Sequence, residues 1–522
     1  MTKKMKRHSN LLSTGTVGGW TLISRIFGLI RDLTTTSLQG ASLYHDIFIL
    51  ILRIPTSLRT FLIEGAFSNA FIPIYSGFLG KQKIKESIAF VNSLFGLLLI
   101  IFFLLTIIAL IFPSIFIFIF APGYLFDPEK NLIAIDMHRI MFPYLSLLAL
   151  VSLAGGIQNS HNKFAVPAAT PILFNICVIS SAFLLSPYFN IPIYGLAYGV
   201  LFAGFFQVFF QIPSLRSLKI GLKPSLNLKA EGLNKFFSLL FPSLVVGSLL
   251  QVNLVIDSIF SSFLPIGSPT WLYISQRLMQ LPLGIFAIAI STVLLPSLSK
   301  SYAAKNTSEY SASLNQGLRF VIFLGAPSAV GLAIFSEPIV GTIFNRGEFS
   351  WSDVQMTAYS LSALTIGLPF FMIQRILAPA FFSRLNARTP MIIGIISILM
   401  NILANYVLGF HFEYGHVGLA IASTFAVVLS VSLLLWVLAR EKILNIKSLI
   451  SAIYIKIFVS SIILAFYLLS ALKYFNFEIL EQAHRMVYLI LTIGGGVIIY
   501  ISLCLILGIR FEHFKISYLQ KI

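Results

Sequence analysis

Residues 97–120 read LLLIIFFLLTIIALIFPSIFIFIF, and this stretch decides the fold class because it contains no charged side chain. A membrane-spanning helix needs about 20 consecutive apolar residues. A strand of a membrane β-barrel would alternate apolar and polar residues, and this stretch does not alternate. The stretch therefore predicts a transmembrane α-helix.

Apolar stretches of similar length recur from one end of the 522-residue chain to the other. Hydrophobic residues make up 57% of the chain and charged residues only 10%, whereas soluble domains carry about 25% charge. The mean hydropathy is +0.91. These values exclude a soluble enzyme, a nucleic-acid-binding domain and a disordered tail. We predict an all-α polytopic membrane protein with about 14 transmembrane helices.

The lysines and arginines predict how the chain is oriented in the membrane. With the N-terminus in the cytoplasm and alternating spans, cytoplasmic segments hold 23 of the 36 basic residues. External segments hold four, namely Lys130, Arg346, Lys473 and Arg485. Cytoplasmic loops of membrane proteins are enriched in Lys and Arg. We therefore expect both termini in the cytoplasm, and we assign most of the net charge of +18 to these loops rather than to nucleic-acid binding.

Two pairs of prolines reveal an internal repeat. Pro73 and Pro296 each end an apolar span and precede a basic loop, and they lie 223 residues apart. Pro167 and Pro390 each begin a span, and the same offset separates them. Parallel repeats of this kind are typical of transporters whose binding site lies between two halves. We predict a six-helix half over residues 1–215, a basic cytoplasmic linker over 216–235, a second six-helix half over 236–440, and two extra helices with a tail over 441–522.

The first two predicted spans carry charged residues, which are costly inside a membrane and usually functional. At 100° per residue, Arg25 and Asp32 share a face of the first helix. Arg53 and Glu64 share a face of the second helix with Ser57 and Thr60 between them. The remaining charges of this region are Arg31, Asp46 and Arg59, and Asp46 falls in the external turn between the two spans.

The eighth span adds a second polar face, formed by Tyr273, Arg277, Gln280 and Gly284. In one interpretation these charged groups only pair with each other and hold helices together. However, these spans hold five arginines (Arg25, Arg31, Arg53, Arg59 and Arg277) but only three acids (Asp32, Asp46 and Glu64), so pairing leaves a net positive charge. The planar guanidinium group is suited to binding phosphate oxygens. The surplus therefore favours an anionic substrate that carries phosphate, and it argues against a cation exporter.

The sequence contains no GxxxxGK[ST] phosphate-binding loop and no soluble segment large enough for an ATPase domain. We therefore expect transport to use an ion gradient, the membrane potential or the substrate gradient. The cysteines, Cys177 and Cys504, lie in apolar stretches without the spacing of a disulfide framework or a metal site. No cofactor is expected apart from a candidate cation.

A candidate sodium site combines Asp257 with Asn401 and Asn405, which are four residues apart on one helix face. Carboxylate and amide oxygens suit a hard cation such as Na⁺. The alternative is an aspartate that is hydrogen-bonded across helices without any metal.

Several segments resemble the MurJ (MviN) family of lipid II flippases. The resemblance covers essentially the whole chain. The matching segments are SRIFGLIRD at 24–32, RIPTSLRTFLIEGAFSNAFIP at 53–73, YISQRLMQLP at 273–282, LLPSLS at 294–299, and LAPAFFS at 377–383 followed by RTP at 388–390.

The resemblance implies the fold of the multidrug/oligosaccharidyl-lipid/polysaccharide exporter superfamily and no enzymatic activity. It implies transport of undecaprenyl-pyrophosphoryl disaccharide-pentapeptide (lipid II) across the bacterial inner membrane for peptidoglycan synthesis. It also implies a cationic central cavity and a lipid groove formed by the last two helices. We expect a monomer surrounded by membrane lipids, with proteins of cell-wall synthesis as partners and no nucleic acid.

The resemblance also assigns residues. Functional family positions coincide with Arg25, Arg31, Asp46, Arg59, Glu64 and Arg277. Arg53 stands where a lysine is common and Thr270 where a serine can occur, so the expected substrate-binding set includes both. Asp32, Asp46 and Glu64 are expected to be structural or gating charges. Gln276 and Gln280 stand where some members carry an acid.

Two other functions remain as alternatives. A flippase for another lipid-linked oligosaccharide would have the same fold and a similar charge pattern. A multidrug/cation antiporter of the same superfamily would have the fold but a more acidic cavity.

Overall fold

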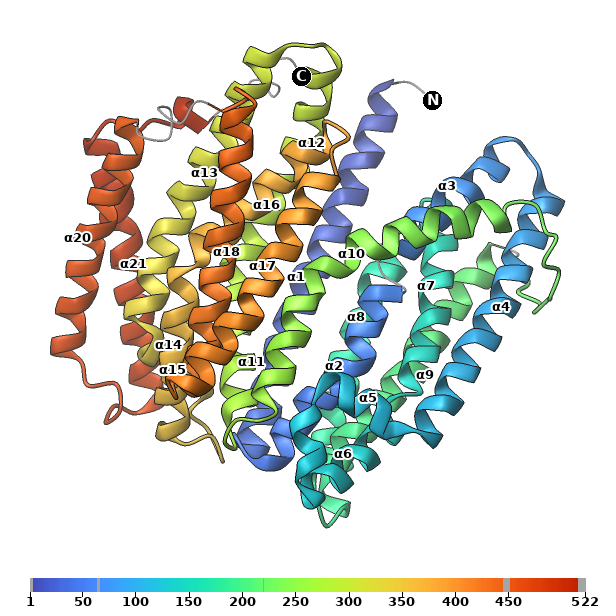
Figure 1. The fold of residues 1–522 in the computed structure, drawn as a ribbon, viewed down its shortest axis with the longest axis horizontal. Coiled ribbons are helices and arrows are strands. Elements are labelled where there is room, and N and C mark those ends of the chain that lie inside the picture. Colours follow the sequence, from blue (N-terminus) through green and yellow to red (C-terminus); the bar gives the residue numbers. More distant parts are fainter. Residues whose placement is uncertain (1–2, 63–65, 219, 445–450, 515–522) are drawn as a thin grey trace. The chain divides into compact units, whose positions relative to one another are not determined.

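The computed structural model describes residues 3–62, 66–218, 220–444 and 451–514, and every regular element in these ranges is helical (Figure 1). The all-α prediction is confirmed for this part of the chain. Glu64, one of the predicted gating charges, lies outside the described residues.

The chain divides into two compact units, Met1–Ile266 and Gly267–Ile522. The first unit contains α1 (Lys3–Gln39), α2 (Leu43–Leu62), α3 (Ala66–Gly80), α4 (Ile84–Ile111), α5 (Pro113–Phe120), η1 (Pro122–Phe126), α6 (Pro128–Met141), α7 (Tyr144–Ser160), α8 (Ala165–Leu184), η2 (Ser186–Tyr188), α9 (Ile193–Ser217) and α10 (Leu233–Ser261). The second unit contains α11 (Ser268–Pro282), η3 (Leu283–Ala287), α12 (Ile288–Ala303), α13 (Thr307–Ile334), α14 (Ser336–Phe344), α15 (Trp351–Ile366), α16 (Leu368–Phe382), α17 (Arg388–Tyr406), η4 (Val407–His411), α18 (Gly415–Arg440), α20 (Ala452–Tyr474), α21 (Gln482–Ile506) and η5 (Phe511–Phe514).

Within the described ranges, nine helical segments are long and apolar enough to cross a membrane. The pair α15 and α16, bent by 45°, adds a tenth if the two helices form one span. The helix α2 is not among them, since it carries Asp46, Arg53 and Arg59 within 20 residues. Multiple apolar spans are thus established, and the number 14 stays a prediction.

Local sequence explains where several helices begin. Pro113 and Pro128 stand in the first turn of α5 and α6, where a missing N–H costs nothing. The Asp127 carboxylate caps α6 by accepting the N–H groups of Glu129 and Lys130 at 3.1 and 3.3 Å. Ser350 begins α15 with a capping box, in which Asp353 bonds back to the Ser350 N–H.

An aromatic core joins α3, α4 and α10 in the first unit. The rings of Phe67, Phe71, Phe90 and Phe236 are each at most 3% exposed and lie within 5.4–6.3 Å of one another along the cluster. Gly156 of α7 faces this cluster, where a Cβ would lie 2.9 Å from the Phe71 ring. This packing holds α3 against α4, α7 and α10.

A chain of buried amides and hydroxyls joins α7, α8 and α9. Gln211 accepts a hydrogen bond from Gln158 and donates one to the Thr170 hydroxyl at 2.8 Å. Gln207 donates to the Thr170 carbonyl at 3.1 Å and accepts from the Tyr144 hydroxyl at 3.4 Å. All five residues are at most 3% exposed. Hydrogen bonds between polar side chains of this kind join membrane helices. The Gln158 Oε1 atom has no partner among the described residues.

The basic linker lies against α4. Asn92 accepts the Ser225 N–H on its carbonyl at 3.1 Å and the Lys223 N–H on its side-chain oxygen at 3.0 Å. Gly96 permits this approach, because a Cβ there would lie 2.3 Å from the Ser225 carbonyl oxygen. The linker segment that the structure describes is therefore anchored by specific backbone contacts.

The two C-terminal helices, α20 and α21, pack on each other and on α13 and α14 (Figure 1). The Tyr500 hydroxyl of α21 donates to the Phe323 carbonyl of α13 at 2.8 Å. Gly495 and Gly496 allow close packing, because a Cβ would lie 2.4 Å from the Tyr467 hydroxyl and 2.9 Å from Leu464, respectively. The neighbouring Gly494 faces open space.

Candidate functional site

The candidate charges of α1 are held by α8. The Asn175 side chain donates to the Ser24 carbonyl at 3.2 Å, and Arg31 lies over the Phe174 ring at 5.3 Å. Arg31 forms an ion pair with Asp32, with Nη2 2.6 Å from Oδ1, and Asp32 is 2% exposed. The structure thus brings two predicted site residues together as a pair of opposite charge.

Arg25 lies on the same helix, and its side chain is half-buried. It shares its face of α1 with Gly28 and Asp32, as the helical spacing predicts. Among the residues that the structure describes, Arg25 makes no hydrogen bond or ion pair.

Arg53 of α2 joins this helix to α10. Its Nη1 donates to the Leu254 carbonyl at 3.0 Å and to the Ser258 hydroxyl at 2.7 Å. Ser258 is adjacent to Asp257, which is 4% exposed. In this conformation Arg53 therefore ties α2 to α10. The residue that it contacts, Ser258, directly follows the predicted cation ligand Asp257 in the sequence.

The two ends of α2 differ in environment. Asp46 at its start is 2% exposed and lies near the buried Tyr124 of η1. Burial, with the Asp46 carboxylate adding to it, raises the pKa of the Tyr124 phenol well above its ordinary value. Arg59 lies near the other end of α2, where its Nε is buried. Asp46 and Arg59 thus lie at opposite ends of one 20-residue helix.

In the second unit, α11 is fixed by its packed face. Trp271 donates to the Asp353 carboxylate of α15 at 3.0 Å, and the Ser275 hydroxyl donates to the Thr357 carbonyl at 2.9 Å. Thr270, predicted to bind substrate, is fully buried and lies seven residues before Arg277, on the same face of α11. The side of α11 opposite Trp271 and Ser275 carries Tyr273, Arg277 and Gln280, and Gly284 lies in the following π-helical turn η3.

Asn401 and Asn405 lie on α17 and are fully buried. The Asn405 amide donates to the Asn401 side-chain oxygen at 3.3 Å, and the Asn401 amide contacts Ser423 of α18 at 3.5 Å. The Asn405 side-chain oxygen has no hydrogen-bond partner among the described residues. A buried acceptor of this kind fits a cation ligand. The structure describes Asp257 as part of the first unit and both asparagines as part of the second.

Sequence reasoning missed several polar groups in these helices. His45 is 1% exposed and lies in the field of Asp32 and Arg31. His416 of α18 packs against the Trp271 ring at 4.9 Å and contacts the Met356 carbonyl through Nε2 at 2.9 Å. The glutamines of α9 were detectable, because Gln207 and Gln211 are four residues apart in an otherwise apolar helix.

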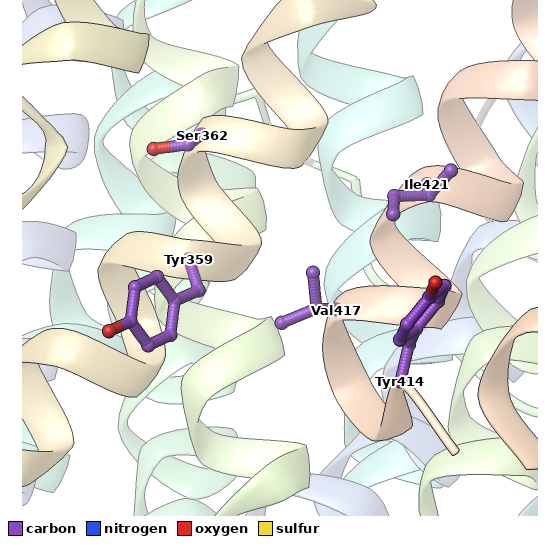
Figure 2. A pocket seen from close by; sticks show the side chains of 5 residues that line it. All are labelled: Tyr359, Ser362, Tyr414, Val417 and Ile421. Carbon is purple, nitrogen blue, oxygen red and sulfur yellow. The ribbon is translucent and has the colours of Figure 1, made fainter. Parts of the chain in front are cut away.

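A groove of about 420 Å³ lies between α15 and α18 in the second unit. Figure 2 shows Val417 between the rings of Tyr359 and Tyr414, with Ser362 and Ile421 completing the lining. The lining contains no charged side chain. This groove therefore suits hydrocarbon and is distinct from the charged candidate residues.

Comparison with known proteins identifies the family. A family profile described as "Lipid II flippase MurJ" matches residues 36–493. The chain is 36% identical over 517 residues to a "Probable lipid II flippase MurJ" of Buchnera aphidicola subsp. Schizaphis graminum, covering 98% of this chain and 99% of that protein. It is 35% identical over 517 residues to the protein of the same description from Vibrio cholerae, covering 97% and 98%.

Solved structures agree with this result. A structure titled "Lipid II flippase MurJ, inward closed conformation" matches with a TM-score of 0.80 at 29% identity and covers 94% of this chain and 98% of that one. An inward-facing multidrug resistance MATE family transporter of the MOP superfamily matches with a TM-score of 0.65 at 14% identity, covering 80% and 94%, which shows likeness of fold alone. Profile, full-length relatives and structure point to one conclusion: the chain belongs to the MurJ family of lipid II flippases.

Proposed function

We propose that this protein moves lipid II from the cytoplasmic to the external leaflet of the bacterial inner membrane by alternating access, with both termini in the cytoplasm. The observation that carries the proposal is similarity to proteins described as lipid II flippases at 36% identity over nearly the whole of both chains. The 23-to-4 distribution of basic residues supports the orientation.

The arginines supply the chemistry for the pyrophosphate of the substrate. Guanidinium groups bind phosphate oxygens through paired N–H donors. Arg25, Arg59 and Arg277 are the direct ligands in our proposal. Arg31 and Arg53 are engaged by Asp32 and by α10 in the conformation described here. These two arginines contribute to binding when rearrangement of the helices releases them.

A cation also has a place in the proposal. Asp257, Asn401 and Asn405 would supply oxygen ligands to Na⁺, and the buried Asn405 oxygen without a partner supports this choice. A bound Na⁺ would add a positive charge and link transport to the sodium gradient. The alternative, an aspartate hydrogen-bonded across helices, predicts flipping that is independent of sodium and unchanged by Asp257→Ala.

The test is a flipping assay in proteoliposomes with fluorescent lipid II. Wild-type protein should flip the probe, and Arg277→Ala and Arg59→Ala should abolish flipping while the protein inserts normally. Arg139→Ala is a matched control, because the exposed Arg139 only donates to the Leu110 carbonyl at 3.2 Å. Normal flipping by both Arg277→Ala and Arg59→Ala would refute the assignment of these arginines.

Competitors separate the alternative functions. A lipid-linked oligosaccharide without the pentapeptide should compete weakly, and an organic cation should not compete. Equal competition by the peptide-free lipid would favour a flippase for another polymer, and inhibition by the cation alone would favour a multidrug antiporter.

A further inference from the structure

Three polar side chains lie in the region where α13 packs against the start of α20, and two of them, Arg319 and Tyr454, are neighbours. The three are Arg319 on α13 and Ser451 and Tyr454 at the start of α20, and we call them the α13–α20 site. Ser451 stands at the N-cap position of α20 without a side-chain cap bond, and its carbonyl accepts the Tyr454 N–H at 3.0 Å, so it lies beside the first turn that contains Tyr454. The charge of the Arg319 guanidinium acts on the Tyr454 hydroxyl, which places these two groups next to each other.

Each of these residues has a buried donor that lacks an acceptor. Arg319 Nε, the Ser451 hydroxyl and the Tyr454 hydroxyl are buried, and none has a hydrogen-bond partner among the described residues. Arginine can only donate, and each hydroxyl has one proton to donate. The Tyr454 oxygen can accept from Arg319, but its own proton still needs an acceptor. Buried donors are almost always satisfied in native proteins, so the site calls for a ligand that accepts several hydrogen bonds.

The charge of the surrounding helices indicates that this ligand is an anion. Neither α20 nor α21 contains an aspartate or glutamate, and Lys456 adds another positive charge on α20. The short helix η5, which packs on α13 through Phe514, carries Glu512, but this side chain is exposed and forms no ion pair with Arg319 among the described residues. The one carboxylate of α13 is Glu309, which bonds with Asn306 at the start of the helix, about 15 Å from Arg319 along the axis. Arg319 is half-buried with its Nε atom buried, and it forms no ion pair with a described carboxylate, so its positive charge favours an anion.

The depth of the site indicates where the anion comes from. Tyr454 lies in the first turn of α20, at the end of the apolar span Ala452–Tyr474. A position at the end of a span is level with the lipid headgroups. Basic pockets between transmembrane helices on the cytoplasmic side bind phosphate headgroups, and the distribution of basic residues predicts that this end of α20 is cytoplasmic.

We propose that the α13–α20 site binds the phosphate group of a phospholipid in the cytoplasmic leaflet. The guanidinium of Arg319 engages the phosphate oxygens, and the hydroxyls of Ser451 and Tyr454 donate to those that remain. The alternative is that Arg319 only extends its guanidinium toward water. That alternative does not account for the buried, unpartnered hydroxyls of Ser451 and Tyr454. The site belongs to the second unit alone and is separate from the arginines assigned to lipid II.

Native mass spectrometry of the purified full-length protein tests the proposal. The protein is incubated with dioleoylphosphatidylglycerol and, in parallel, with dioleoylglycerol, which has the same chains but no phosphate. Wild-type protein should retain phosphatidylglycerol and not dioleoylglycerol. Arg319→Gln should weaken retention roughly tenfold, as expected for loss of a charged hydrogen-bonding group. Tyr454→Phe removes one hydroxyl without changing the charge and should weaken retention by a smaller factor, while Arg139→Gln should not change it.

A third arm adds inorganic phosphate to the protein with bound phosphatidylglycerol. Retention that persists in excess phosphate supports a lipid headgroup, and displacement by phosphate would assign the site to a free anion and overturn the lipid proposal. Unchanged retention in both Arg319→Gln and Tyr454→Phe would also overturn it, as would equal retention of dioleoylglycerol. Tyr454→Phe keeps the test decisive if Arg319→Gln fails to fold.

Discussion

The Arg31 guanidinium donates two hydrogen bonds to one oxygen of the Asp32 carboxylate, from Nη2 at 2.6 Å and from Nε at 3.0 Å. The two residues are neighbours in the sequence, and their side chains are only 13% and 2% exposed. A buried cation and anion in contact reduce each other's cost in the membrane. The pair therefore stabilises the first helix. A phosphate group of a substrate would have to compete with the Asp32 carboxylate for the Arg31 guanidinium.

Substitution of the acid should separate these two roles. Asp32→Asn keeps the shape and removes the charge, so the free energy of unfolding should fall by about 2–4 kcal/mol because a buried guanidinium loses its counter-charge. The double variant Arg31→Gln, Asp32→Asn should recover much of this loss and still fail to support growth of a flippase-depleted strain. Thermal unfolding and complementation measure the two effects. Full growth of the double variant would show that Arg31 has a structural role only.

A methyl group at position 123 should displace the end of α10. A Cβ on Gly123 would lie 2.3 Å from the Ser262 carbonyl oxygen, and this backbone cannot move aside as a flexible side chain could. We expect Gly123→Ala to destabilise the protein by roughly 1–3 kcal/mol, the usual cost of overpacking. Gly77→Ala is the matched control, because no atom lies within 4 Å of a Cβ at that position. Equal melting temperatures for Gly123→Ala and the wild type would contradict the contact.

The loop after α7 should make stability depend on pH. His161 Nε2 accepts a hydrogen bond from the Tyr75 hydroxyl at 3.1 Å when the imidazole is neutral. Burial, together with the nearby Lys163 ammonium, holds the pKa of His161 below its ordinary value. The neutral form is therefore favoured in the folded protein, and its contribution to stability is present above about pH 6.5 and is lost as the pH falls below that value.

Thermal unfolding at pH 7.5 and 5.5 checks this effect. His161→Gln should reduce the difference in melting temperature between the two pH values. An unchanged pH dependence in His161→Gln would assign the effect to other groups.

Membrane potential should drive transport. One charge moved through 100 mV is worth about 2.3 kcal/mol, and the negative cytoplasm favours export of an anionic headgroup. The same potential favours return of an empty cationic binding site toward the cytoplasm. We expect valinomycin with K⁺ to stop flipping and collapse of ΔpH alone to leave it intact. Undiminished flipping at zero potential would leave a coupled ion or the substrate gradient as the energy source.

Sequence reasoning succeeded where the helix is regular. The face of α11 with Tyr273 and Arg277 follows from 100° per residue, because the helix is unbroken between them. The same rule places Arg31 on a different face of α1 from Asp32, because consecutive residues of an α-helix project 100° apart. The pair forms anyway, since the long arginine side chain can bend back to the adjacent carboxylate.

Contacts between distant segments were beyond the sequence. Arg53 and Ser258 are 205 residues apart, and no periodicity indicates which hydroxyl a membrane arginine will meet. The bond from Trp271 to Asp353 spans 82 residues in the same way. The apolar spans, by contrast, depend only on local composition, so their existence was predictable and their partners were not.

The buried amide chain of α7, α8 and α9 has a consequence for biogenesis. Gln158 on α7, Thr170 on α8, and Gln207 and Gln211 on α9 form these hydrogen bonds only when the three helices are together. A polar side-chain group left without a partner in hydrocarbon is costly, so each helix released alone would expose such a group to lipid. These helices should therefore leave the insertion machinery as a group. A ribosome-bound intermediate that ends between α8 and α9 should hold α7 and α8 beside the translocon until α9 emerges.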